Sequence, residues 1–284
     1  MKENSQFCSS REGFTLVEVL VATAVLAGLL ALLLQISGLT LRMSRLLNAQ
    51  MDSAQEARIV LDTISADLNN CIVTSNTPLF AMISSSNSQL LFVTRTRGPS
   101  SVADFRLMAV SYELANNKVL RRTAEITWPD ADVARAALSV IPSTNASVLA
   151  EGVLRFDSTV VLNDGTVTQL STGAGAAWTT TTWQGKSLPD QCVALLPPAT
   201  TVMSGTNTLR VKALVVGVAT LDPRSLRNIS HLGVDPTSIL PATSGSSTPV
   251  EAWSAVASGT ASTTQKVPAA LLSSLLISQQ SYSF

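Results

Sequence analysis

The strongest pattern along the chain is a long apolar run close to the N-terminus. Residues 14–36 read FTLVEVLVATAVLAGLLALLLQI, and Glu18 is the single charged residue among them. About 20 apolar residues in a helix are enough to cross the hydrocarbon core of a bilayer. The run therefore predicts a transmembrane helix over residues 14–36, preceded by a polar leader at residues 1–13.

Beyond this run the pattern becomes that of an amphipathic helix. Apolar or small residues recur at alternating steps of four and three, which keeps them on one helical face. They are Met43, Leu47, Gln50, Ala54, Ala57, Leu61, Ile64 and Leu68. No proline occurs before Pro78, and Asn69-Asn70 is a favourable helix end. A helix from Phe14 to about Asn70 would be about 85 Å long. Residues 37–70 are its amphipathic continuation, and we expect the first half of the helix to lie in lipid and the second half to pack on a globular domain.

From residue 71 onward the sequence predicts short strands separated by turns. The expected strands are Gln89–Thr94, Phe105–Leu114, Lys118–Arg122, Val148–Leu162 and Leu209–Leu221. Asn116-Asn117 suits a two-residue hairpin turn, and Asn163-Asp164-Gly165 is a second turn signal. The apolar character of residues 209–221 predicts a central strand. The predicted fold is α+β, with the long helix packed on antiparallel sheet over residues 71–284.

Two later segments carry weaker patterns. Residues 243–264 are rich in Ser, Thr, Ala and Gly, which predicts a loop. Residues 268–277 are expected to form a short helix with leucines on or near one face, namely Leu271, Leu272, Leu275 and Leu276. The expected role of this helix is to cover the domain, with partner binding as the alternative.

Composition and charge argue against several classes of function. The chain has 19 basic and 19 acidic residues, and the basic ones are scattered, so it lacks the positive patch that nucleic-acid binding needs. Charged residues make up 13% of the chain, against about 25% in a typical soluble domain. One histidine and three cysteines without a C-x-x-C pair disfavour a zinc site. No cofactor and no metal are therefore expected.

Candidate catalytic residues are equally sparse. Any catalytic histidine must be His231, and nothing near it resembles a nucleophile elbow. Gly173-Ala174-Gly175 is a lone G-x-G in a Ser/Thr/Ala-rich stretch, which predicts a loop and not a phosphate site. Scattered acidic residues lack the D-x-D-x-D spacing of a calcium loop, so we expect solvated turns at Asp130, Asp132, Asp157 and Asp164.

The cysteines leave two interpretations open. Cys8 has no apolar run before it, which disfavours a lipoprotein signal. Cys71 and Cys192 could form a disulfide, which would stabilise the domain by about 4–5 kcal/mol in the chain-entropy model. Two buried free thiols are an equally good interpretation of the same residues.

Glu18 is the most informative residue of the apolar run. An ionised carboxylate in hydrocarbon costs several kcal/mol unless it is paired or lies at the interface, so a plain anchor has no reason to carry it. Two alternatives remain for the run itself. Ala22-Thr23-Ala24 reads as the cleavage site of a secretory signal peptide, and an unprocessed single-pass anchor is also compatible with the length.

The residues around Glu18 carry a family resemblance. Gly13-Phe14-Thr15-Leu16-Val17-Glu18, after a leader ending in Arg11-Glu12-Gly13, resembles the class III signal sequence of type IV prepilins and pseudopilins. The resemblance implies that prepilin peptidase cleaves after Gly13 and N-methylates Phe14. It also implies that Glu18 pairs with the terminal amine of a neighbouring subunit, where the two charges would offset each other's desolvation.

The order of later motifs resembles that of the J-type minor pseudopilins of type II secretion systems. These motifs are Tyr112-Glu113-Leu114, Leu120-Arg121-Arg122, Leu149-Ala150-Glu151-Gly152-Val153, Trp183 and Leu188-Pro189. Inserts at residues 171–182 and 200–207 and the extension after Asp222-Pro223 depart from a compact J-type domain. A pseudopilin-like cassette of verrucomicrobial genomes is a further family that the chain resembles.

The resemblance implies a structural subunit and not an enzyme: a minor pseudopilin or pilin-like protein of a type II secretion pseudopilus or a type IV pilus-like filament. It places the chain in the bacterial inner membrane as a single-pass protein, with its globular domain in the periplasm. The implied partners are prepilin peptidase, other pilin or pseudopilin subunits, the inner-membrane assembly platform and membrane lipid. The alternative is an extracytoplasmic enzyme or binding domain anchored by one helix.

Overall fold

The computed structural model describes residues 15–73, 79–83, 88–97, 105–126, 146–169, 182–183, 186–187, 192–195, 201–204, 207–235, 239–241, 247–259 and 275–283. The chain divides into two compact units, Met1–Asn48 and Ala49–Phe284. Each unit is described by itself below.

The described part of the first unit is helical. Helix α1 spans Leu16–Asn69, so its predicted end at Asn70 is confirmed to within one residue. Its apolar side chains up to residue 48 are exposed, for example Leu20 at 61% and Leu33 at 59%. Within the described residues, α1 is the one helix long and apolar enough to cross a membrane. Exposed leucines over this length are unfavourable in water, so the first unit requires lipid or other apolar helices around it.

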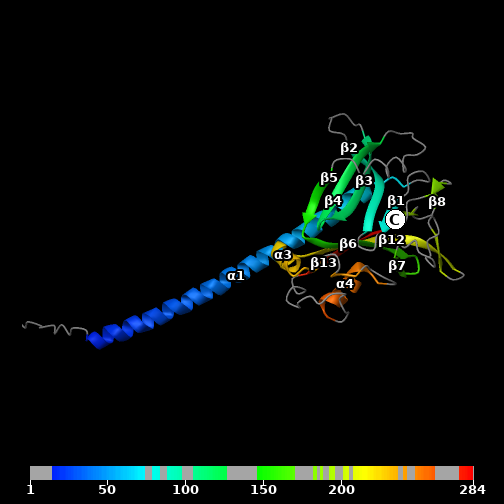
Figure 1. Ribbon diagram of the computed structural model, residues 1–284. Coiled ribbons are helices and arrows are strands. Elements are labelled where there is room, and N and C mark those ends of the chain that lie inside the picture. Colours follow the sequence, from blue (N-terminus) through cyan, green and yellow to red (C-terminus); the bar gives the residue numbers. More distant parts are fainter. Residues whose placement is uncertain are drawn as a thin grey trace, which may run out of the picture. The chain divides into compact units, whose positions relative to one another are not determined.

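The second unit contains two large antiparallel sheets (Figure 1). The first has six strands in the order β10-β1-β2-β3-β4-β5, and the second has the order β11-β12-β6-β7 with β13 also paired to β12. The strands are β1 Leu79–Ile83, β2 Ser88–Arg97, β3 Phe105–Ala115, β4 Lys118–Ile126, β5 Ala146–Glu151, β6 Val153–Leu162, β7 Val167–Gln169, β10 Cys192–Leu195, β11 Thr201–Ser204, β12 Asn207–Thr220 and β13 Leu276–Ser283. Strands β8 Thr182–Trp183 and β9 Lys186–Ser187 pair separately. The predicted α+β class is therefore confirmed.

The predicted β3–β4 hairpin is present. Asn116 and Asn117 have φ values of 51° and 58°, the left-handed conformations that a two-residue hairpin turn requires. Strand β12 lies between β6 and β13, which confirms its predicted central position.

Residues 148–162, predicted as one strand, form two strands that belong to different sheets. Gly152 separates β5 from β6 with φ +71°. Its carbonyl oxygen accepts a hydrogen bond from the Leu221 N–H at 2.9 Å. A Cβ at this position would lie 2.6 Å from the Leu221 carbonyl oxygen, so only glycine fits the corner.

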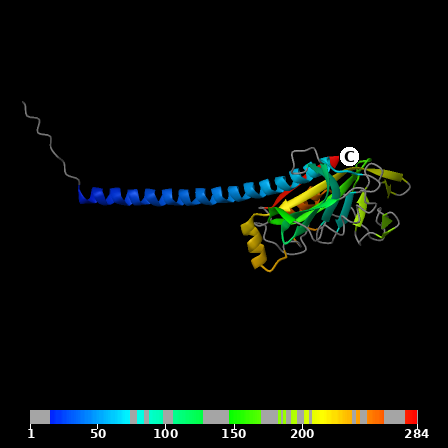
Figure 2. The ribbon, with the colours of Figure 1, turned by 90° about the horizontal axis from the view of Figure 1, so that it is seen from above.

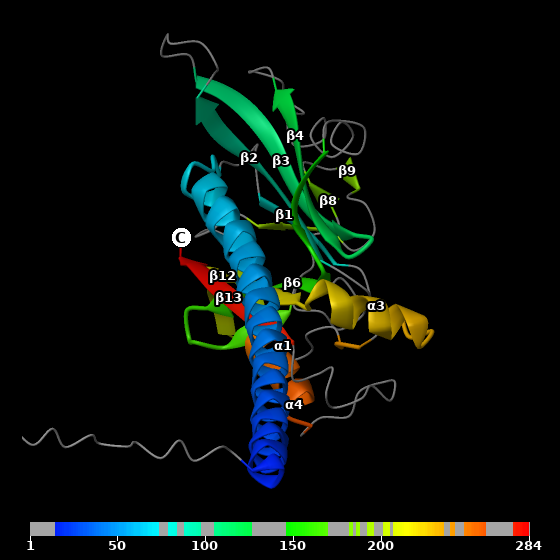
Figure 3. The ribbon, with the colours of Figure 1, turned by 90° about the vertical axis from the view of Figure 1, so that its left-hand side faces the viewer.

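The core of the second unit lies between α1 and both sheets (Figure 3). Helix α1 contributes Ala57, Val60, Leu61 and Ile64, all buried. The sheets contribute Leu79, Leu90, Phe92, Val110, Tyr112, Val119, Phe156, Val160, Leu214, Val216, Val218 and Tyr282, among others. The predicted face is confirmed at Ala57, Leu61 and Ile64. It is wrong at Met43 and Leu47, which are exposed and lie in the first unit.

Two short helices were not predicted. Helix α3 spans Pro223–His231 and α4 spans Pro249–Ala257. The loop expected over residues 243–264 is therefore wrong at α4, where Thr248 and Glu251 form a capping box. A smaller core cluster under α4 includes Trp253, Val256, Leu154, Ala219 and Leu221.

The helix expected over residues 268–277 is wrong at its C-terminal end. Leu276 and Ile277 begin strand β13, which pairs with β12 from Thr220↔Leu276 to Ala213↔Ser283. Leu276 packs against the main core and Ile277 against the smaller cluster, so pairing with an apolar central strand and burial on its two faces favour the extended form. Leu271 and Leu272 lie outside the described residues.

Candidate processing and assembly site

The N-terminus of α1 is closed by a capping box formed by Thr15 and Glu18. The Thr15 N–H and the Thr15 hydroxyl each donate to Glu18 Oε2 at 3.1 Å, and the Glu18 N–H donates to Thr15 Oγ1 at 3.3 Å. The arrangement satisfies backbone N–H groups that a helix start otherwise leaves without partners.

This capping box gives Glu18 a role within its own subunit. Its carboxylate lies in the first helical turn, where the helix dipole stabilises a negative charge. Glu18 was expected to find its partner in a neighbouring subunit, although the T-x-x-E spacing from Thr15 to Glu18 is a local signal for a capping box. Both hydrogen bonds that described residues donate to the carboxylate end on Oε2, so Oε1 has no donor among these residues.

Gly13 and Phe14, the predicted cleavage site, lie outside the described residues. Their place in the sequence nevertheless relates them to the capping box. Phe14 directly precedes the N-cap residue Thr15, so cleavage after Gly13 would place the new terminal amine one residue before the start of α1.

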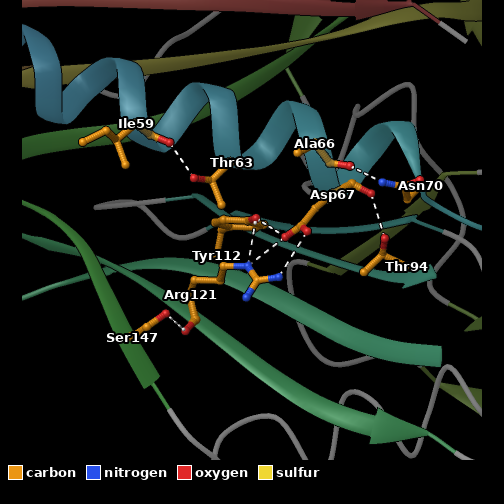
Figure 4. A network of polar contacts seen from close by, with 9 residues as sticks. All are labelled: Ile59, Thr63, Ala66, Asp67, Asn70, Thr94, Tyr112, Arg121 and Ser147. Carbon is orange, nitrogen blue, oxygen red and sulfur yellow. Dashed lines mark hydrogen bonds and ion pairs between the residues drawn. The ribbon is translucent and has the colours of Figure 1, made fainter. Parts of the chain in front are cut away.

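A second polar network fixes the other end of α1 within the second unit (Figure 4). Arg121 on β4 contacts both carboxylate oxygens of Asp67, with Nε 2.8 Å from Oδ2 and Nη2 3.1 Å from Oδ1. The Tyr112 hydroxyl on β3 also donates to Asp67 Oδ2. The ring of Tyr112 is fully buried and stacks on Phe92, with 6.0 Å between ring centroids. The network joins α1 to the six-stranded sheet through charge-assisted hydrogen bonds.

The network also shifts the ionisation of its members. Burial and the neighbouring Asp67 carboxylate raise the pKa of Tyr112, so its hydroxyl stays protonated as a donor. Burial alone would lower the pKa of Arg121, but its hydrogen bonds and attraction to Asp67 raise it overall. Both shifts favour the neutral tyrosine and charged arginine that hold Asp67.

Backbone contacts complete this end of α1. The Thr94 hydroxyl donates to the Asp67 carbonyl oxygen at 2.9 Å, and the Arg95 N–H donates to the Asn70 carbonyl oxygen at 2.9 Å. Strand β2 thus provides partners for carbonyl groups that the last helical turn leaves open.

The second sheet also binds α1. The Tyr282 hydroxyl on β13 donates to the Leu61 carbonyl oxygen at 2.9 Å, and the Thr220 hydroxyl on β12 donates to the Ser53 carbonyl oxygen at 3.4 Å. On the six-stranded sheet, the N–H of Glu151 at the end of β5 donates to Glu56 Oε2 of α1 at 3.0 Å. Residues 53–70 of α1 are therefore attached to both large sheets.

Cys71 and Cys192 are not brought together. Cys71 is a free cysteine and pairs through its backbone with Thr94 on β2. Cys192 lies on β10 opposite Met82, which in turn lies opposite Gln89 on β2. Gln89 and Thr94 are five residues apart, or about 16 Å along a strand, whereas disulfides join Cα atoms less than about 7 Å apart. Burial, followed by the charge of Asp67, raises the pKa of the Cys71 thiol to about 12.

Of the acidic residues considered for calcium, the structure describes Asp157 and Asp164, which lie in different surroundings. Asp164 lies in the β6–β7 turn, and its pKa is lowered because its carboxylate accepts hydrogen bonds from the Thr166 hydroxyl and N–H. Asp157, expected in a solvated turn, is instead buried on β6 at 3.9 Å from Arg155. Asp130 and Asp132 lie outside the described residues. Within the described ranges, no three His, Cys, Asp or Glu side chains form a metal-binding group.

Comparisons with known proteins bear on the N-terminal segment. The family model described as the prokaryotic N-terminal methylation motif matches residues 8–34. No curated protein matches the chain. Among solved structures, a type IV-like pilin from Thermus thermophilus is similar at 12% identity, with 81% of this chain and 94% of that chain covered and a TM-score of 0.38. Likeness at this level does not assign a function.

The matched residues contain the predicted cleavage site, the capping box and the exposed apolar part of α1. A motif of this kind followed by such a helix fits a single-pass membrane-anchored protein. The chain thus carries a prokaryotic N-terminal methylation motif, which is a class III signal sequence, at the start of an α+β protein.

Proposed function

We propose that the chain is a minor pseudopilin or pilin-like structural subunit that is anchored in the inner membrane and assembled into a filament. The observation that carries the proposal is the match of residues 8–34 to the methylation motif, with Glu18 in the first turn of an apolar, exposed helix. Prepilin peptidase cleaves after Gly13 and methylates Phe14, and the globular unit faces the periplasm. The subunit acts through binding and not through catalysis.

Glu18 guides assembly through two sets of contacts. Within its own subunit, Oε2 closes the capping box with Thr15 and orders the first turn of α1. Oε1 is available to the terminal amine of a neighbouring subunit. In an apolar surrounding this amine and carboxylate stabilise each other only when both are present, so the pair selects one register between neighbouring helices.

The second unit supplies a fixed body at the other end of the same helix. Asp67, Leu61 and Ser53 of α1 are bonded to strands of both large sheets. A domain held in this way presents the same surface to every partner, as assembly requires. The proposed partners are other pilin or pseudopilin subunits and the inner-membrane assembly platform. The filament is a type II secretion pseudopilus or a type IV pilus-like filament.

The first experiment determines the mature N-terminus. The full chain is co-expressed with its prepilin peptidase and extracted from membranes, and its intact mass and N-terminal sequence are measured. We expect a chain that begins at Phe14 and carries one added methyl group. A start after Ala24 would indicate a secretory signal peptide, and an intact Met1 an ordinary anchor. Either result would overturn the proposal.

The second experiment separates the two roles of Glu18. Glutamine at this position can still close a capping box but carries no charge, whereas Thr15→Ala weakens the cap and keeps the charge. We expect Glu18→Gln and Glu18→Ala to insert in the membrane and be cleaved, yet to be lost from sheared filaments. Thr15→Ala should retain most incorporation. Normal incorporation of Glu18→Gln would show that Glu18 serves only as a cap.

A further inference from the structure

Helix α3 presents two exposed basic side chains, and its N-cap residue Asp222 accepts hydrogen bonds from the backbone N–H groups of Arg224 and Ser225. Arg224 and Arg227 are both exposed, while Ile229 faces the core. The Arg227 Nε donates to the Pro223 carbonyl oxygen within the same helix. In the described part of the chain, neither arginine takes part in an ion pair. Figure 2 shows α3 projecting from the second unit, away from the sheets. The helix therefore offers two positive charges to a partner.

The flank of α1 in the second unit has the opposite charge. Asp52 is exposed and Glu56 is half-buried, and neither has a cationic partner within the described residues. Burial raises the pKa of Glu56 most; the hydrogen bond from the Glu151 N–H opposes this shift, and repulsion from the Glu151 and Asp52 carboxylates adds to it. A cation placed here would relieve this repulsion, so the flank favours a positively charged partner.

These two surfaces lie at one end of the second unit. The Thr220 hydroxyl binds the Ser53 carbonyl oxygen, and α3 begins three residues later at Pro223. The Leu221 N–H binds the Gly152 carbonyl oxygen, next to Glu151, whose N–H binds Glu56. The base of α3 and residues 53–56 of α1 are thus joined by short hydrogen-bonded links.

We propose that Arg224 and Arg227 of one copy bind Asp52 and Glu56 of a second copy of the chain. This inference rests on the proposed function, because it needs copies anchored side by side in one membrane. Both surfaces belong to the second unit, so each copy carries the basic helix and the acidic flank on the same compact body.

The charges at this end favour a second copy over lipid. Lys118 already pairs with Glu151 within one copy, and the Asp222 carboxylate caps α3. The charges without an ion pair among the described residues are then Asp52 and Glu56 on the flank and Arg224 and Arg227 on α3. Anionic headgroups would attract α3 but repel the flank beside it. A second copy presents both a basic helix and an acidic flank. The arginines of one copy can then face the unpaired carboxylates of the other.

The test uses the full chain in lipid nanodiscs that hold several copies. A photoreactive benzoylphenylalanine replaces Asn228, which is exposed on α3. We expect a cross-linked dimer whose peptides join α3 to the flank around residues 52–56. The double variants Arg224→Glu/Arg227→Glu and Asp52→Lys/Glu56→Lys, each alone, should lower the dimer yield about tenfold, because like charges then face each other.

Mixing the two double variants should restore the cross-link, since an all-acidic copy then meets an all-basic one. The matched control is Arg210→Glu/Lys212→Glu, which reverses two exposed charges toward the other end of β12. It should leave the yield unchanged. Cross-links to lipid instead of protein, no rescue on mixing, or an equal loss in the control would overturn the proposal. N-terminal sequencing of the same sample separates failure of this contact from failure of processing at Phe14.

Discussion

Arg121 contacts Asp67 through two nitrogen atoms, with Nε 2.8 Å from Oδ2 and Nη2 3.1 Å from Oδ1. Their side chains are 25% and 15% exposed, which makes the pair one of the less solvated ion pairs of the described residues. It joins the last turns of α1 to strand β4 of the six-stranded sheet, more than fifty residues away in sequence. Bidentate geometry and low exposure give such a pair more effect on stability than a surface pair has.

Replacing Asp67 by asparagine should destabilise the second unit by about 2 kcal/mol, because Arg121 and Tyr112 would be left without a charged acceptor. Urea unfolding of the detergent-solubilised chain, followed by tryptophan fluorescence, measures the loss. The control is Asp62→Asn, which removes an exposed pair with Arg58 and should cost less than about 0.5 kcal/mol. Equal effects of both variants would contradict this account of the network.

Gly152→Ala should prevent the sharp connection between β5 and β6. The new Cβ would meet the Leu221 carbonyl oxygen at 2.6 Å in a backbone conformation with φ +71°. Gly165 also has a positive φ, +86°, but a Cβ there would have no neighbour within 4 Å. Gly165→Ala should therefore cost about 1 kcal/mol and Gly152→Ala clearly more. Thermal unfolding of the two variants in parallel provides the comparison, and a milder effect at Gly152 would argue against the close contact.

Cys71 should react slowly with iodoacetamide in the folded protein. Its pKa of about 12 leaves about one thiol in ten thousand as thiolate at pH 8. Because the folded pKa lies above the usual value, the protonated thiol stabilises the fold at neutral pH, and this contribution is lost as pH rises through about 12. Peptide mass spectrometry should show rapid labelling of Cys71 in denaturant without reductant. Labelling only after reduction would reveal a disulfide.

Glu56 should make the fold more stable in mild acid. Its pKa in the folded state is raised above 4.5, chiefly by burial. The folded protein therefore binds this proton more tightly than the unfolded chain does. The resulting stabilisation is fully present below pH 4.5 and is lost as pH rises through the higher folded pKa. Unfolding curves for the wild type and Glu56→Gln between pH 4 and 7 should diverge over this window; parallel curves would contradict the assignment.

The parts of the fold that were predicted from the sequence are those fixed by local patterns. The length of α1 follows from its uninterrupted periodicity and from Asn69-Asn70. The β3–β4 hairpin follows from two consecutive asparagines, which tolerate positive φ. The central place of β12 follows from its apolar sequence. In each case the information lies in residues adjacent along the chain.

The predictions that were wrong concern elements set by distant residues, or helices whose N-cap residues were not recognised in the sequence. The break at Gly152 depends on Leu221, almost seventy residues later, and no local signal reveals that contact. Strand β13 depends on pairing with β12, which overrides the helical spacing of its leucines. Helices α3 and α4 could have been found from Asp222-Pro223 and from Thr248-Pro249 with Glu251.

The candidate site also combines features set by adjacent residues with features set by residues far apart in the sequence. The methylation motif is a contiguous string, and residues 8–34 were recognisable without any structure. The capping role of Glu18 is also local, since Thr15 lies three residues before it, but it was not predicted. The network of Asp67, Tyr112 and Arg121 joins three separate elements, and only the three-dimensional arrangement brings their side chains together.

The attachment of α1 to both sheets has a mechanical consequence. A force applied along α1 would be transmitted to the second unit at Ala49. It would load in shear the hydrogen bonds made at Ser53, Leu61, Asp67 and Asn70. Bonds loaded in shear must yield together, whereas bonds that are peeled yield one at a time. The domain would therefore follow its helix as one body under tension, and extraction from a membrane would not strip the helix from the sheets.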